Sequence, residues 1–108
     1  MSMEPAKVVA CMKSCGLQCA HMCFPKGSAP PLPWAVYYID TTSDFCADGE
    51  LWDEVPNWIV EVYEKSFDFE LHRKVKEAIA REFSPPIVEQ SWVEDENCLL
   101  TTYAFKEI

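Results

Sequence analysis

The sequence is poor in positive charge and in glycine, and it has no long apolar run. Nine Lys and Arg stand against 18 Asp and Glu among 108 residues, which gives a net charge of −9 at pH 7. A chain with this balance repels nucleic acid phosphates, so stable binding of DNA or RNA through a basic face is disfavoured. The three glycines, Gly16, Gly27 and Gly49, are isolated, and this excludes a glycine-rich phosphate-binding loop.

No window approaches the roughly 18 apolar residues that a membrane-spanning helix needs, and no secretory signal is recognisable. We therefore expect a protein that is made and kept in the cytoplasm, with no membrane contact. Hydrophobic residues make up 49% of the chain and charged residues 25%, both ordinary for a folded protein. This length and composition predict a single domain over residues 1–108.

Periodicity and turn residues divide the chain into two helices and four or five strands. Gly16 is placed to end a first helix, and Asp68 is placed to cap a second. β-branched and aromatic residues predict the strands, with Asn97 in the turn of a final hairpin. The expected elements are a helix at 6–14, a weak strand at 17–24, strands at 34–42 and 57–64, a helix at 69–83, and strands at 88–93 and 98–105. This order predicts an α+β fold, a small antiparallel or mixed sheet of four to five strands with two helices packed on one face.

Four of the six cysteines, Cys11, Cys15, Cys19 and Cys23, follow one another at intervals of four residues. On one helix they would form a row of sulfurs, which suggests a metal site. Zinc sites, however, pair cysteines across a turn and add a second pair from elsewhere, and Gly16 divides this set. Without a secretory signal, reduced thiols that serve as small buried side chains are the better expectation.

Signals for catalysis are poor. His21 lies within the cysteine run, and we expect His72 to face solvent because it lies off the apolar stripe of its helix. A catalytic histidine needs a positioned nucleophile or carboxylate, and the sequence names none. The acidic stretch at 44–54 lacks the regular ligand spacing of a calcium loop. We therefore expect no enzyme, no cofactor and no resident metal.

Aromatic residues are the more informative excess, since the chain has four tryptophans. Trp34 and Trp58 fit strands, whereas Trp52 lies among charges in a long acidic stretch, residues 43–56. Aromatic side chains in polar surroundings are typical anchors of protein interfaces. We predict an interface with neighbouring subunits or partners in this stretch, formed by Asp44, Phe45, Asp48, Trp52, Asp53 and Glu54.

Several local phrases, in this order and at this length, are similar to one known family. They are FPKG and APPLPWAVY between Phe24 and Tyr37, DFCAD from Asp44, WIVEVYEK from Trp58, and WVEDEN from Trp92. With them, the chain from about Val8 to Ile108 resembles the tail terminator or tail-completion (head–tail joining) proteins of long-tailed phages and prophages. The cysteine run departs from this pattern, so nothing in the resemblance requires the cysteines.

The resemblance implies a structural protein that assembles into a ring, commonly a hexamer. Such a ring caps the finished tail tube and joins it to the head, so the implied partners are copies of the chain, the tail-tube protein and a head-side connector protein. DNA would pass through the lumen without stable binding, which suits the acidic balance of the chain. The implied location is the virion, assembled in the cytoplasm of the bacterial host.

Two other functions stay open on the sequence. The first is a small metal-binding or redox module built on Cys11, Cys15, Cys19 and Cys23. The second is an acidic inhibitor that binds a basic partner, for which the net charge is the only signal.

Overall fold

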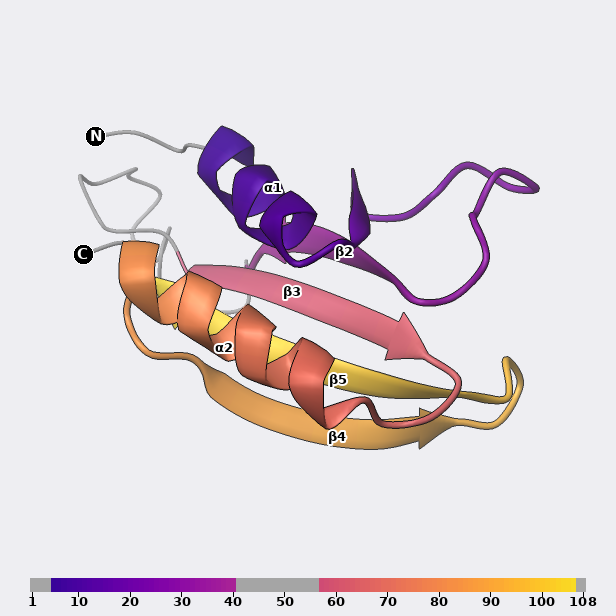
Figure 1. The fold of residues 1–108 in the computed structure, drawn as a ribbon. Helices are drawn as coiled ribbons and strands as arrows, with labels where there is room; N and C mark the ends of the chain where they lie inside the picture. The colour runs from indigo at the N-terminus through magenta and orange to yellow at the C-terminus, as the bar shows by residue number, and fades with distance from the viewer. Residues whose placement is uncertain (1–4, 41–56, 107–108) are drawn as a thin grey trace, which may run out of the picture.

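A computed structural model describes residues 5–40 and 57–106. Within these ranges, two helices and five strands form one mixed sheet, in the strand order β1-β2-β3-β5-β4 (Figure 1). The elements are α1 (Pro5–Ser14), β1 (Gln18–His21), β2 (Trp34–Ile39), β3 (Asn57–Glu64), α2 (Phe69–Glu82), β4 (Ile87–Val93) and β5 (Cys98–Lys106). The predicted α+β class and mixed sheet are confirmed, and the weak first strand is present.

The ends of both helices follow from single residues that the sequence displays. Gly16 has a φ of +83°, a conformation that costs glycine little, and its N–H donates to the carbonyl of Lys13 at the end of α1. At the start of α2, the Asp68 carboxylate accepts from the N–H of Leu71 at 3.1 Å, as an N-cap residue does. The predictions for Gly16 and Asp68 are therefore confirmed.

The sheet is built around β3, which pairs with β2 on one side and β5 on the other, both antiparallel. Side chains of β3 alternate along its length, with Trp58, Val60 and Val62 buried and the residues between them half-buried. The final hairpin places β4 against β5, and Asn97 enters its turn with a φ of +53°. Asparagine tolerates this left-handed conformation, so its predicted role in the turn is also confirmed.

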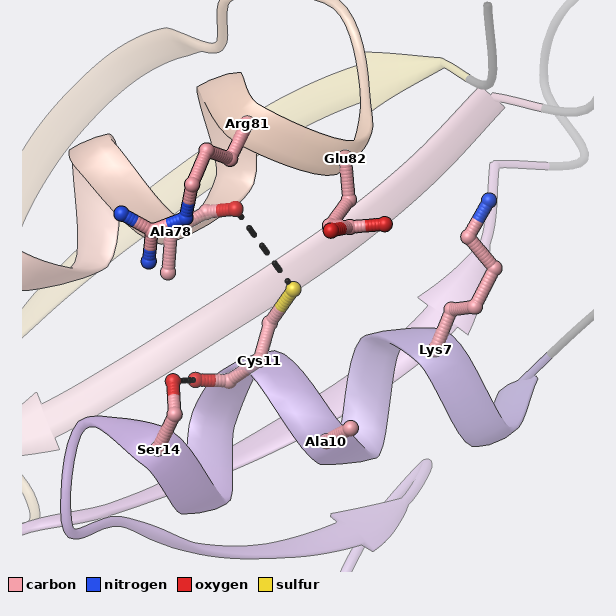
Figure 2. Close-up of a pocket in the computed structure, with 7 residues that line it drawn as sticks. All are labelled: Lys7, Ala10, Cys11, Ser14, Ala78, Arg81 and Glu82. Carbon is pink, nitrogen blue, oxygen red and sulfur yellow. Dashed lines mark hydrogen bonds between the residues drawn. The ribbon is translucent and has the colours of Figure 1, made fainter.

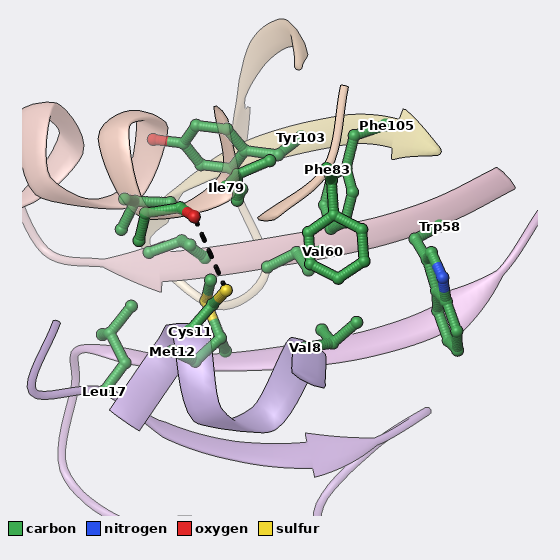
Figure 3. Packing of buried hydrophobic residues seen from close by; sticks show 14 of the residues in the cluster. Val8, Cys11, Met12, Leu17, Trp58, Val60, Ile79, Phe83, Tyr103 and Phe105 are labelled. Carbon is green, nitrogen blue, oxygen red and sulfur yellow. Dashed lines mark hydrogen bonds between the residues drawn. The ribbon is translucent and has the colours of Figure 1, made fainter. Parts of the chain in front are cut away.

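One buried cluster joins the helices to the sheet (Figure 3). Val8, Cys11 and Met12 of α1 meet the apolar stripe of α2 over side chains from β2, β3 and β5. Figure 1 shows α1 and α2 side by side over this part of the sheet, and contacts join the two helices directly. The stripe is the one expected from helical spacing and consists of Leu71, Val75, Ala78 and Ile79, with Phe83 just beyond it.

The two edges of the sheet differ. β1 is short and parallel to β2, whereas β4 is a strand of seven residues paired only with β5 among the described residues. Six of the seven residues of β4 are exposed, so the layer of helices does not cover this strand. No helix in the described part of the chain is long and apolar enough to cross a membrane.

Candidate functional site

Large apolar side chains are exposed along β4 and at the start of α2. Phe69 is 81% exposed, Ile87 70% and Trp92 51%, with Phe67 and Val88 close to two-fifths. We call these five residues the apolar edge surface. Single exposed apolar residues need no explanation, but a group of them on one edge of a small domain is typical of an interaction site.

The strand pattern places these side chains on both sides of the sheet edge. Val88 and Trp92 pair with Tyr103 and Leu99 of β5, and they lie on the side of the helices. Ile87 pairs with Ala104 and faces the opposite side. Between α2 and β4 lies an open pocket of about 310 Å³, lined by Phe67, His72, Lys76, Val88, Gln90, Thr101 and Tyr103.

The floor of this pocket holds a cluster that the sequence did not predict. His72 is only 3% exposed, so the expectation that it faces solvent is wrong. Its Nε2 bonds the Glu64 carboxylate and its Nδ1 bonds the Tyr103 hydroxyl, while the Phe67 ring stacks on the imidazole at 4.4 Å between centroids. The histidine lies next to Leu71 on the helix, where the apolar stripe broadens to include a polar side chain with two partners.

Each polar atom of this cluster has a partner. In the tautomer with its proton on Nε2, the ring donates to Glu64 and accepts from the Tyr103 hydroxyl. Burial, with the charge of Glu64, raises the pKa of Tyr103, so the phenol keeps its proton. Because the three side chains are buried, they tie α2 to β3 and β5 and present no exposed reactive group.

The cysteines do not form a metal centre in the described part of the chain, where no group of three or more His, Cys, Asp or Glu is placed to hold an ion. Cys11 faces a groove of about 350 Å³ between α1 and α2, and its thiol donates to the carbonyl of Ala78 at 3.6 Å (Figure 2). Cys15 and Cys19 pack against the core, whereas Cys23 is exposed beyond β1. Burial raises the pKa of Cys11 and Cys15, and that of Cys19 to about 12.

The fold therefore disfavours the thiolate at Cys11, Cys15 and Cys19, and the thiolate is the nucleophilic form of a cysteine. The groove in Figure 2 is also lined by Lys7, Arg81 and Glu82, so it combines charges of both signs. The structure places the four cysteines of the spaced run in different surroundings, and this weakens the metal or redox alternative.

On the face of the sheet away from the core cluster, one carboxylate is held by two phenols. The hydroxyls of Tyr38 and Tyr63 donate to the two Glu61 oxygens, at 2.7 and 2.8 Å. Burial and the neighbouring carboxylate raise the pKa of Tyr38 to about 12. Both oxygens of Glu61 are thereby engaged, and the arrangement fixes β2 against β3 rather than presenting a free carboxylate.

The predicted interface residues lie outside the described residues: Asp44, Phe45, Asp48, Trp52, Asp53 and Glu54. The apolar edge surface was missed, although a terminal hairpin whose first strand lacks lysine and proline could have drawn attention to an open edge. Comparison of the sequence with models of known protein families gives no match, and comparison with curated proteins gives none.

Proposed function

We propose that this chain is a structural subunit that assembles with copies of itself into a ring, which caps the tail tube of a phage or prophage and joins it to the head. The observation that carries the proposal is the apolar edge surface, Phe67, Phe69, Ile87, Val88 and Trp92. A small domain gains little from exposing such side chains unless another surface covers them. The partners in this proposal are further copies, a tail-tube protein and a head-side connector.

Two further observations support an assembly role over chemistry. The buried histidine has both ring nitrogens engaged, and burial raises the pKa of the three inner thiols, Cys11, Cys15 and Cys19. The chain also carries a net charge of −9, which allows DNA to pass a ring of such subunits without being retained. The resemblance in the sequence gives the specific form of the assembly, a ring at the end of a tail tube.

The test is to add the purified protein to polymerising tail-tube protein from the same phage genome and to measure tube lengths by negative-stain electron microscopy. We expect shorter tubes with a ring of extra density at one end. The variant Ile87→Ser with Trp92→Ser removes much of the apolar edge surface and should lose this effect. Lys13→Ser, an exposed change on α1, is the matched control and should keep it. Tubes of unchanged length and bare ends with the wild-type protein would refute the proposal.

A further inference from the structure

Among the described strands, the sheet ends in two open edges, β1 and β4. The backbone groups along the outer side of an edge strand have no partner in the sheet, and another strand can satisfy them. Natural proteins commonly protect long edges with proline, lysine or a bulge. The sequence of β4, IVEQSWV, has none of these residues and one charge, that of Glu89.

The two edges run in opposite directions. β1 is parallel to β2, and each later pair in the sheet, β2–β3, β3–β5 and β5–β4, is antiparallel. The strand direction therefore reverses three times between β1 and β4, so β4 runs antiparallel to β1. In a ring whose axis follows the strands, every copy keeps the same strand directions, so the β4 edge of one copy meets the β1 edge of the next in antiparallel order.

The helices also suit this arrangement. α1 packs beside β1 and α2, whereas the helix-side residues of β4, Val88 and Trp92, are exposed. If the sheet continued from β4 into the β1 strand of a neighbour, the neighbour's α1 would come with it on the same side. Val88 and Trp92 would then lie beside a helix, as β3 and β5 already do within one copy (Figure 1).

From these observations we infer that the sheet continues from one copy of this chain to the next, with β4 of one copy antiparallel to β1 of its neighbour. This inference rests on the proposed function and names the two surfaces that meet. Matching of faces restricts the register: Gln18 shares its face with Ser91, and His21 shares its face with Val88. In an antiparallel pair of strands, the residue numbers of facing partners add up to a constant. The pair Gln18 and Ser91 gives the same constant as the pair His21 and Val88, so one register can contain both pairs.

We infer a second copy at the β4 edge because the same chain has a second open edge, β1, that is complementary to it. The chain carries its own complementary edge, in the opposite direction, with exposed side chains at Gln18 and His21 and no fixed charge of the same sign as Glu89. The competing arrangement is a twofold pair of β4 strands, which would close a dimer and leave β1 open. A ring requires two different surfaces on each copy, and β4 with β1 provides them.

The experiment uses charges at four exposed positions. The β4-Lys change is Val88→Lys with Ser91→Lys, and it is combined in one chain with either a β1-Lys change, Gln18→Lys with His21→Lys, or a β1-Glu change, Gln18→Glu with His21→Glu. Facing like charges destabilise a strand pair and opposite charges stabilise it. Self-association is measured by sedimentation velocity at low and high salt, and urea unfolding of each variant checks that the fold is intact.

We expect the chain with β4-Lys and β1-Lys to associate about tenfold or more weakly than the chain with β4-Lys and β1-Glu, with the difference reduced at high salt. Equal loss of association in both chains would overturn the inference and favour the twofold β4 pair. Unchanged association in both would overturn it by placing the interface elsewhere, as would a wild-type protein that never self-associates. The two proposals can fail separately. If the charge variants contradict the pairing of β4 with β1 but the protein still caps tubes, only the inference about the edges is refuted and the proposed function is kept.

Discussion

Removing the carboxylate of Glu64 should destabilise the domain strongly, although the residue touches no exposed surface. The carboxylate accepts from His72 and also from the backbone N–H of Asp68, at 3.3 Å, where the chain enters α2. In Glu64→Leu, the imidazole keeps its partner Tyr103 but its Nε2 is left buried without an acceptor. The change therefore tests whether the buried cluster holds α2 on the sheet.

The expected magnitude follows from this loss. A buried donor without a partner costs about 1–3 kcal/mol, and breaking one side of a buried ion pair costs about 3–5 kcal/mol. Between these two limits, we expect a loss of about 2–4 kcal/mol in the free energy of unfolding. Domains of this size commonly have about 5–15 kcal/mol in total, so the melting temperature should fall by roughly 10–20 °C.

The assay is urea unfolding at pH 7, followed by far-ultraviolet circular dichroism, for Glu64→Leu, His72→Leu and the double variant. The double variant should be more stable than the sum of the single losses predicts, by about 1–3 kcal/mol, because neither His72 nor Glu64 is then left buried without the other, and the loss of a partner by the Tyr103 hydroxyl and the Asp68 N–H is counted in the single variants already. Glu70→Gln is the control, since its carboxylate is exposed and bonds only Arg73; its unfolding midpoint should stay close to that of the wild type. Strictly additive losses would refute the view that the two side chains act as a pair.

Three further predictions concern caps, thiols and the hairpin. Asp68→Ala should lower the free energy of unfolding by about 1 kcal/mol in urea unfolding, and Asp68→Ser should restore most of it, because a serine hydroxyl also caps helices; equal losses in the two would contradict the cap. The pKa of Cys19 is raised to about 12 by burial, so the folded state favours the protonated thiol; its contribution to stability is complete below the ordinary value near 9 and is lost as the pH rises towards 12. The urea concentration at the unfolding midpoint should therefore decrease as the pH is raised from 8 to 11, and it should decrease less in Cys19→Val. Iodoacetamide at pH 8 should label the exposed Cys23 well before Cys19. Equal labelling rates of the two cysteines would contradict the burial argument. Asn97→Val should cost about 1 kcal/mol or more because valine resists the positive φ of the turn, whereas Asn97→Gly should cost little, and thermal unfolding of both variants checks this difference.

Much of the fold could be predicted because local signals agreed with one another. The stripe of α2, the cap at Asp68 and the alternation of β3 each describe a contact within one element, and the structure has them where the sequence places them. The mixed sheet could be predicted only as one of two forms, because the parallel pairing of β1 with β2 depends on a crossover through a loop. The sequence of a strand of four residues does not indicate which other strand it pairs with.

The burial of His72 could not be predicted for a related reason. Its partners, Glu64 and Tyr103, come from two different strands. Spacing along α2 puts His72 at the margin of the apolar stripe, where either solvent or a buried partner is possible. Only the placement of α2 over β3 and β5 decides between them, and this placement is a property of the assembled core.

The same reasoning explains why the apolar edge surface escaped notice. Strand propensity is alike for central and edge strands, so it does not indicate which strand lies at an edge of the sheet. The structure instead leaves β4 outside the helix layer, with Ile87 and Trp92 exposed. β4 carries exposed apolar side chains and lies at an open edge that runs opposite to the other open edge, β1. A subunit requires such a pair of edges if its sheet and its helix layer are completed by a neighbour.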